Sequence, residues 1–205
     1  MTTDIADHRF IIGIDLGTTN CAVSYVDLQA KGTTTKRIRI FKIPQMTGPG
    51  EVNRLPVLPS FLYIPGEFDI SREAIVELWE GAESNFAGAF ARDHGAQVPA
   101  RLVSSAKSWL CHAKVDRQAR ILPWGADKEV PKVSPVMATA AYLKHIRMAW
   151  NDLWGPDDSL LLENQLIIAT VPASFDEVAR ELTLEAAKLG GLNNVVLLEE
   201  PLAAF

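Results

Sequence analysis

A short turn near the N-terminus carries the residue types that bind phosphate. In the stretch FIIGIDLGTTNCAVSYVDL, an apolar run ends at Asp15, the chain bends through Gly17, Thr18 and Thr19, and apolar alternation resumes after Asn20. Glycine lets a backbone approach a phosphate closely, and backbone N–H groups and hydroxyls are suitable donors. Asp15 cannot ligate an anionic phosphate directly, but its carboxylate can hold a hydrated Mg²⁺ that bridges the two groups.

The same residues also fit a tight hairpin in which the aspartate only forms the turn. The D-x-G-T-T pattern is short, and its spacing alone does not decide between a hairpin and a phosphate site. Neither G-x-x-x-x-G-K-[ST] nor G-x-G-x-x-G occurs in the chain. The chain therefore lacks both of these glycine-rich nucleotide-binding motifs. If the turn binds phosphate, the elements on either side of it must position its residues.

Strands are expected on both sides of the turn. Residues 10–16 and 20–27 read as two strands, and the strict alternation of RIRIFKI at 37–43 predicts a half-buried third strand. The three would form an antiparallel meander. Two apolar runs, QLIIATV at 165–171 and VVLLE at 195–199, predict buried strands of a sheet covered by helices on both faces.

Capping residues predict where the helices of the C-terminal part begin and end. Ser134 followed by Pro135 predicts the start of a helix that runs to about Trp154. The sequence SFDE at 174–177 predicts a capping box, in which the Ser174 hydroxyl accepts the Glu177 N–H. The helix after it would end at Gly190–Gly191. Together with the strands, these helices predict an α/β fold.

Residues 44–133 read as an inserted α+β subdomain. Prolines and glycines punctuate the beginning, and SFLYIP at 60–65 predicts a short strand. Two helices are predicted at 71–94 and 100–113. The organisation that follows is a core formed by residues 1–43 and 134–205, with the subdomain inserted between them.

Composition limits the classes of function. The chain has 205 residues, 48% hydrophobic and 22% charged, with a net charge of −5, which argues against an electrostatically driven binder of nucleic acid or membrane surfaces. No apolar run approaches the ~20 residues of a membrane span, and the N-terminus does not resemble a secretory signal. Cys21 and Cys111 lie outside any C-x-x-C pattern. Free thiols in a reducing cytoplasm are the simplest interpretation.

The last residues, EPLAAF at 200–205, read as the start of a helix whose apolar face is unmatched. A short terminal turn is the alternative. The expectation is that the chain is truncated at this point.

Four stretches resemble the Hsp70 family of ATP-dependent chaperones, within the actin/sugar-kinase ATPase superfamily. GIDLGTTN is similar to the first phosphate loop of that family, and the segment IIATVPASFDEVARELTLEAAKLGGLNNVVLLEEPLAAF is similar to its connecting segment. LPSFLYI and SSAKSWL resemble two weaker motifs between them. The resemblance covers essentially the whole chain.

This resemblance implies a fold and a function. The chain would be lobe I of a nucleotide-binding domain, with a ribonuclease-H-like, actin-type core. ATP and Mg²⁺ would bind between this lobe and a second lobe, and hydrolysis would control a separate peptide-binding domain. Unfolded peptides and co-chaperones would be the partners of the complete protein. One lobe holds about half of the nucleotide site, so the chain alone is expected to be inactive or weak.

Residue roles follow from the same resemblance. Asp15 would hold the water shell of Mg²⁺, and the turn residues Gly17, Thr18, Thr19 and Asn20 would line the phosphates. Lys107 would orient the attacking water and steady the γ-phosphate. Glu200 would act near the Mg²⁺ and the catalytic water. Pro172 and Arg180 match positions that the family links to interdomain signalling.

Each of these roles has a simpler alternative. Lys107 is also compatible with a solvated helix face. Glu200 could serve only as a favourable acid beside a helix N-terminus, and Arg180 could pair on a helix surface. The adjacent Cys111 and His112 point to different faces of a helix, so packing and exposure explain them better than a joint site.

The chain also departs from the common chaperones. The loop CHAKVDRQARILPWGADKEVPKV and the proline-rich start of the insertion fit the family poorly, as expected of a divergent bacterial member. Two hypotheses therefore stand: a chaperone ATPase, or a regulatory or cytoskeletal-type actin-like ATPase or nucleotide-dependent binding module without chaperone activity. In either case the surface near residues 200–205 is expected to be apolar and prone to self-association.

Overall fold

The computed structural model describes residues 8–30, 37–66, 69–71, 74–79 and 86–204. The principal sheet has the strand order β11-β10-β1-β2-β3, and β6 also pairs with β2. Its members are β1 (Phe10–Leu16), β2 (Asn20–Asp27), β3 (Arg39–Ile40), β6 (Val57–Pro59), β10 (Leu166–Val171) and β11 (Val195–Glu199). The β1–β10 and β10–β11 pairs are parallel and the others antiparallel. The fold is therefore α/β with a mixed sheet, and the predicted β1–β2–β3 meander is confirmed.

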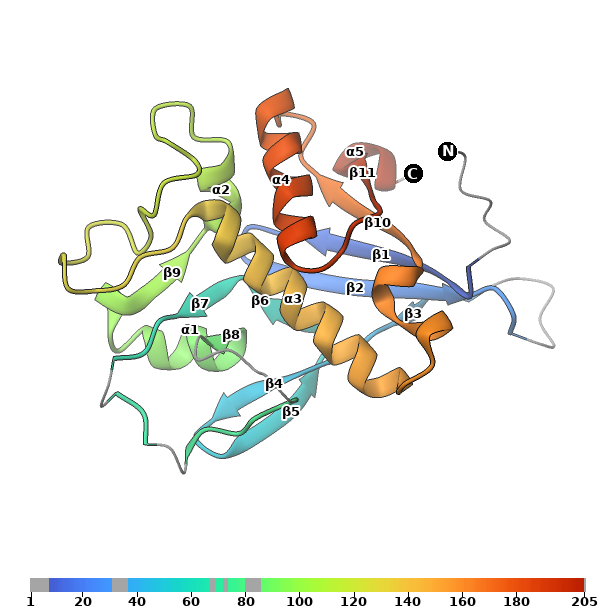
Figure 1. The fold of residues 1–205 in the computed structure, drawn as a ribbon, viewed down its shortest axis with the longest axis horizontal. Coiled ribbons are helices and arrows are strands. Elements are labelled where there is room, and N and C mark those ends of the chain that lie inside the picture. The colour runs from blue at the N-terminus through green and yellow to red at the C-terminus, as the bar shows by residue number, and fades with distance from the viewer. Residues whose placement is uncertain (1–7, 31–36, 67–68, 72–73, 80–85, 205) are drawn as a thin grey trace.

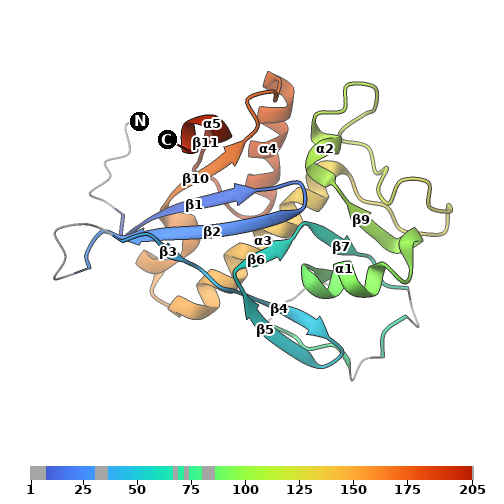
Figure 2. The same ribbon diagram turned by 180° about the vertical axis from the view of Figure 1, so that it is seen from behind.

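Two long helices pack on one face of this sheet. They are α3 (Pro135–Trp154) and α4 (Glu177–Leu189), which lie in front of the sheet in Figure 1 and behind it in Figure 2. Along β1, the side chains of Phe10, Ile12 and Ile14 are buried, whereas Asp15 is exposed. α3 and α4 both lie on the same face, so these two helices do not cover both faces of the sheet as predicted. This explains why β10 alternates between buried and half-buried residues.

The remaining elements lie between β3 and α3 in the sequence. They are a hairpin of β4 (Ile43–Gly48) and β5 (Glu51–Leu55), a three-stranded sheet of β7 (Phe61–Tyr63), β8 (Phe86–Ala87) and β9 (Leu102–Ser104), and the helices α1 (Ala89–Gly95) and α2 (Ala106–Leu110). Short 3-10 turns occur at Pro99–Arg101, Asp158–Leu160 and Leu162–Asn164. A last helical turn, α5 (Glu200–Ala203), follows β11 directly.

The predicted strand at 60–65 is confirmed as β7, but three other predictions in this region are wrong in part. In the helix predicted at 71–94, the described residues include β8 and the α-helix α1 at the end, and 72–73 and 80–85 lie outside the described residues. The helix predicted at 100–113 contains β9, because Val103 pairs with Leu62 of β7. The strand predicted at 37–43 is split between β3 and β4, and Ile40 on its outer edge is 66% exposed.

The helix boundaries of the C-terminal part are mostly as predicted. Ser134 Oγ accepts the Met137 N–H at the start of α3. The capping box at 174–177 is wrong: α4 begins at Glu177 and its cap is Asp176, whose carboxylate accepts the Ala179 N–H at 2.7 Å. The helix begins later because the Phe175 N–H bonds to the Pro172 carbonyl in a preceding turn.

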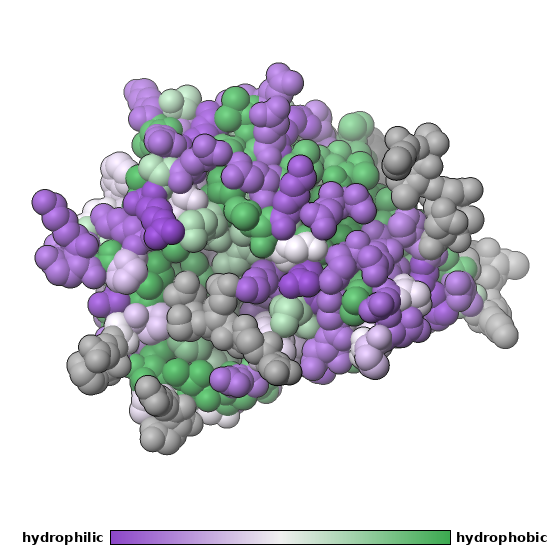
Figure 3. Space-filling model, in the orientation of Figure 1, coloured by the Kyte–Doolittle hydropathy of each residue, from purple (hydrophilic) through white to green (hydrophobic). Residues whose placement is uncertain are grey.

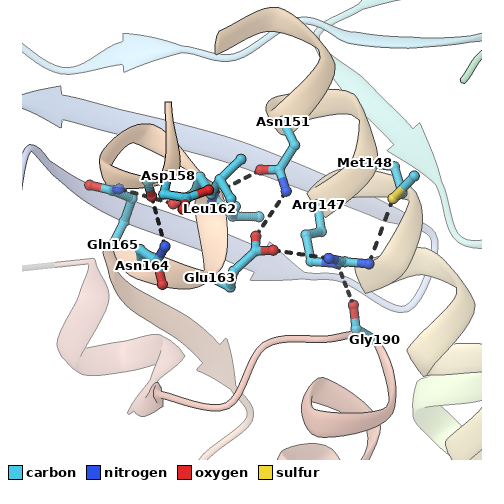
Figure 4. A network of polar contacts seen from close by, with 10 residues as sticks. Arg147, Met148, Asn151, Asp158, Leu162, Glu163, Asn164, Gln165 and Gly190 are labelled. Carbon is cyan, nitrogen blue, oxygen red and sulfur yellow. Dashed lines mark hydrogen bonds and ion pairs between the residues drawn. The ribbon is translucent and has the colours of Figure 1, made fainter. Parts of the chain in front are cut away.

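A polar network joins α3 to the segment between α3 and β10 and to the turn that follows α4 (Figure 4). Arg147 donates to the Gly190 carbonyl and to Glu163, each at 3.0 Å, and Asn151 donates to the other Glu163 oxygen at 2.9 Å. The predicted glycine stop after α4 is confirmed, since Gly191 has a φ of +88°. This network sets the position of the turn that leads into β11.

Over α3 and α4 the visible surface mixes polar and apolar side chains (Figure 3). Val196 in β11 is 53% exposed, so the prediction of a buried strand at 195–199 is wrong for this edge of the sheet. Among the described residues, no helix combines the length and apolar character that a membrane span requires.

Candidate functional site

An open cleft of about 600 Å³ lies at one edge of the principal sheet. The strands β1, β10 and β11 run parallel, so their carboxyl ends meet at this edge. In open sheets of this kind, ligands bind outside the carboxyl ends of the strands. The residues that line the cleft are Asp15, Gly17, Thr18, Lys107, Thr170, Pro172, Glu200, Ala203 and Ala204.

Asp15 reaches the cleft from the carboxyl end of β1. Its backbone is in register with Thr170 of β10, and the Thr170 hydroxyl donates to Asp15 Oδ1 at 2.8 Å. The hydroxyl fixes one carboxylate oxygen, and the side chain remains exposed. The carboxylate is thus oriented at the cleft while keeping capacity for a further ligand.

The turn between β1 and β2 is tight at Gly17. A Cβ atom there would collide with the backbone carbonyl oxygen of Asn20. Of the four turn residues predicted to line a phosphate, Gly17 and Thr18 border the cleft. Thr19 and Asn20 are exposed but do not border it, and Asn20 pairs with Pro59 of β6.

Lys107 enters the cleft from α2. Its side chain is only 10% exposed, which contradicts the alternative of a solvated helix face. The Nζ atom lies 2.7 Å from Glu200 Oε1 and 5.9 Å from the centre of the Phe175 ring. The residue before α2, Ser105, has a φ of +55°, a conformation that non-glycine residues rarely adopt and that often accompanies functional sites. Ser105 is the residue at the N-terminal cap of α2, where the chain turns from β9 into the helix that carries Lys107.

Glu200 is the first residue of α5, at the end of β11. Its side chain is 45% exposed, and it does not cap the helix, since the capping position is Glu199 and no side-chain cap bond forms. The structure therefore brings together three side chains that are distant in the sequence, Asp15, Lys107 and Glu200. An ammonium group and two carboxylates on one open cleft are groups that can receive a polyanion together with a metal ion.

Pro172 and Arg180 lie differently with respect to the cleft. Pro172 borders it, directly after β10. Arg180 is not a lining residue. Its guanidinium donates to Glu199 Oε1 at 2.7 Å and to the Phe175 carbonyl at 3.3 Å. Arg180 therefore forms an ion pair, as the alternative of surface pairing expects, and its partner Glu199 is the residue before Glu200.

Sequence reasoning did not single out Thr170 or Ser60 as parts of the site. Thr170 is adjacent to Asp15 only because of the β1–β10 register, which a single sequence does not reveal. Ser60 lies in the stretch LPSFLYI, and its contacts with the turn depend on the β2–β6 pairing. The signals were present as a hydroxyl at a strand end and a serine after a proline, but both patterns are common.

Cys21 lies behind the turn and is buried. Burial raises the pKa of its thiol to about 11, so the thiol is protonated at neutral pH. Cys111 is exposed and also free. Neither thiol belongs to the cleft lining, which agrees with a role in packing or exposure.

Beside the cleft, α2 carries one member of an aromatic pair. The rings of Trp109 and Trp124 lie 4.8 Å apart at 30°, and the His112 ring stacks on Trp109 at 5.4 Å. Trp124 is 63% exposed. His112 and Cys111 form separate contacts, as expected, because the Cys111 thiol donates to the Ser108 carbonyl.

Comparisons with known proteins extend the resemblance seen in the sequence. The chain is 29% identical over 203 residues to chaperone protein HscA of Salmonella agona. It is 31% identical over 209 residues to a chaperone protein HscA homolog of Photobacterium profundum. Each match covers 96% of this chain and 28% of the relative.

No family model matches the chain. The matches to the chaperone relatives nevertheless cover 96% of the chain. The chain is therefore a divergent Hsp70-like polypeptide that spans 28% of the length of these relatives.

Proposed function

We propose that the chain forms lobe I of the nucleotide-binding unit of an ATP-hydrolysing Hsp70-like chaperone. The observation that supports this most directly is the convergence of Asp15, Lys107 and Glu200 on one open cleft beside the Gly17 turn. In this proposal residues 1–43 and 134–205 form a ribonuclease-H-like core of the actin type, and residues 44–133 form an inserted upper subdomain.

The donor set of the cleft fits ATP with Mg²⁺. Hard cations prefer carboxylate and water oxygens, which Asp15 and Glu200 can supply or hold. The Lys107 ammonium and the turn N–H groups complement phosphate oxygens. Gly17 is required by the tight turn itself, since any side chain would collide with the Asn20 carbonyl, and a turn built on glycine leaves room for a phosphate to approach the backbone. Bound Mg²⁺ would supply charge neutralisation along the phosphates.

Each residue then has a defined task. Asp15, oriented by Thr170, holds the water shell of the metal. Lys107, which Glu200 holds at 2.7 Å, would steady the γ-phosphate and orient the attacking water, and Glu200 would act near the metal and the same water. Gly17 and Thr18, which border the cleft, would contact the phosphates, and Thr19 and Asn20 would line them only from the far side of the turn. Phosphoryl transfer needs little covalent chemistry from a protein, so positioning and charge account for most of the rate.

Pro172 and Arg180 are proposed to report the state of the cleft to other parts of the complete protein. A physical route exists, because Arg180 pairs with Glu199 and the next residue, Glu200, pairs with Lys107. A change in the contacts of Lys107 would therefore alter the restraints on α4. In the complete protein, unfolded peptides and co-chaperones would be the partners and the cytoplasm the location, and a second lobe would complete the ATP site.

The test is single-turnover ATP hydrolysis by the full-length protein with Lys107→Ala or Lys107→Arg. A lysine that acts mainly in the transition state should lose roughly 10²-fold or more in kcat when removed, while ATP affinity changes far less. Arginine keeps the charge but not the compact geometry and should not restore the rate. Lys128→Ala, in an exposed loop, is the matched control.

The outcomes separate the hypotheses. Hydrolysis by Lys107→Ala at the wild-type rate would show that the catalytic assignment is wrong. ATP binding without any turnover by the wild-type protein would favour a regulatory nucleotide-binding module. Turnover that is stimulated by unfolded peptide would support the chaperone.

A further inference from the structure

The turn between β1 and β2 is held from behind by one buried serine. Ser60 lies between β6 and β7 and is 2% exposed. Its hydroxyl donates to the Gly17 carbonyl at 2.8 Å, and its backbone N–H donates to the Thr19 carbonyl at 2.8 Å. Two carbonyl groups of the turn are therefore fixed by a residue from a distant part of the chain.

Every polar group of Ser60 is used. Because its hydroxyl hydrogen is directed to Gly17, the contact of 3.3 Å with Cys21 Sγ requires the thiol to be the donor. The protonated state of the Cys21 thiol, whose pKa burial raises to about 11, agrees with this direction. The Tyr142 hydroxyl of α3 donates to the Ser60 carbonyl at 3.0 Å. A fully satisfied buried network of this kind is rigid.

The anchoring of Gly17 fixes the direction of the next N–H group. A trans peptide is planar, so the Thr18 N–H points opposite to the Gly17 carbonyl. The carbonyl is held on the buried side by Ser60, and Thr18 borders the open cleft on the other side. Within the described residues, no acceptor is recorded for the Thr18 N–H. The N–H is therefore presented to the cleft.

We infer that Ser60 is a positioning residue that orients the Thr18 N–H toward a phosphate of the nucleotide. The inference rests on the proposed function, since it names what prepares the same turn for its ligand. Ser60 does not touch the ligand. Its action passes through the Gly17–Thr18 peptide, so it should strengthen binding of the phosphates and leave binding of the base and sugar unchanged.

Calorimetry on the full-length protein tests the inference with two ligands, Mg-ATP and adenosine. Without the Ser60 hydroxyl the peptide can rotate, and losing one oriented neutral hydrogen bond corresponds to roughly a five- to tenfold change in a dissociation constant. We expect Ser60→Ala to weaken Mg-ATP binding by about this factor and adenosine binding by less than about twofold. A general structural defect would weaken both ligands alike.

Two further variants complete the design. Ser104→Ala, an exposed serine at the end of β9, is the control and should bind both ligands like the wild type. Ser60→Cys keeps the shape but offers a weak donor, so it should fold and bind Mg-ATP with an affinity between those of the wild type and Ser60→Ala. It replaces Ser60→Ala if the latter does not fold.

The failures are distinguishable. A wild-type protein that does not bind Mg-ATP overturns the proposed function, and the inference falls with it. A wild-type protein that binds Mg-ATP, beside folded Ser60 variants with unchanged Mg-ATP affinity or with an equal loss for adenosine, overturns the inference alone.

Discussion

Gly17 occupies a position in which any side chain would collide with the chain itself. The obstacle is the carbonyl oxygen of Asn20, a backbone atom that cannot move aside without opening the turn. The same turn has its carbonyls fixed by Ser60, so it has little room to relax. At this scale the site depends on backbone geometry as much as on its charged side chains.

We therefore expect Gly17→Ala to open the turn. Overpacking of a well-packed site typically costs about 1–3 kcal/mol of unfolding free energy, and phosphate contacts should weaken at least as much as in Ser60→Ala. Urea denaturation and Mg-ATP calorimetry measure the two effects. Gly48→Ala is a suitable control, because its Cβ would meet only the flexible Glu51 carboxylate at 3.2 Å. Equal stability and affinity in both variants would contradict the prediction.

Some features of the site could be predicted at the residue scale, and others could not. Asp15 and Gly17 stand out because a carboxylate and a glycine interrupt an apolar alternation. Thr170 and Ser60 do not stand out, because their contacts arise from strand pairing between residues 155 and 43 positions apart. Such long-range register is a property of the folded sheet rather than of any local pattern.

At the scale of elements, the loop after α2 is attached to the beginning of α4. The two terminal guanidinium nitrogens of Arg117 donate to the Asp176 carboxylate, at 3.0 and 2.9 Å, and the same carboxylate caps α4 through the Ala179 N–H. Arg117 and the Ala179 N–H lower the pKa of Asp176 to about 2. The lowered pKa means that ionised Asp176 stabilises the native state above the ordinary carboxyl range and that this contribution is lost as the pH falls toward 2.

Arg117→Gln should therefore raise the pKa of Asp176 toward its ordinary value of 3.8. The stability that ionised Asp176 contributes above the ordinary carboxyl range should then be smaller, so less of it should be lost on acidification than in the wild type. A carboxyl-detected NMR titration measures the pKa directly. Arg120→Gln, an exposed arginine of the same loop, should leave the titration of Asp176 unchanged. An unchanged pKa in Arg117→Gln would show that the cap bond alone is responsible.

The elements themselves were predicted unevenly, for a physical reason. The strands β1 and β2, with regular apolar alternation, and the helix α3, with a clear N-terminal cap, were predicted with nearly the observed bounds. The errors fall where a short segment takes its structure from a partner, as in β9, whose Leu102 and Val103 add to β7. The cap of α4 was misplaced because Ser174 and Asp176 are both good capping residues, and the turn at Pro172 selects the second.

At the scale of the whole molecule, β11 is an edge strand of the principal sheet and carries exposed apolar side chains. The edge strand β11 exposes Val196 at 53%, and the adjacent α5 exposes Leu202 at 63%. The last residue of the predicted apolar surface, Phe205, lies outside the described residues. Edge strands and exposed apolar side chains both favour association with further polypeptide.

We expect the 205-residue chain to self-associate through this surface in a concentration-dependent way. Leu202→Glu should shift sedimentation toward the monomer, because it places a charge on the apolar surface. Leu153→Glu, at the end of α3 and 46% exposed, is the matched control and should sediment like the wild type. A wild-type chain that remains monomeric at high concentration would contradict this prediction.

The close pair of Trp109 and Trp124 has an optical consequence. Two indole rings 4.8 Å apart can couple their electronic transitions and add an exciton contribution to the circular dichroism spectrum. One ring belongs to α2, two residues after Lys107, and the other to the exposed loop. A shift of α2 that accompanied the binding of a polyanion at Lys107 would move Trp109 relative to Trp124 and change the ring geometry. The protein therefore contains its own spectroscopic reporter of the cleft, which needs no added label.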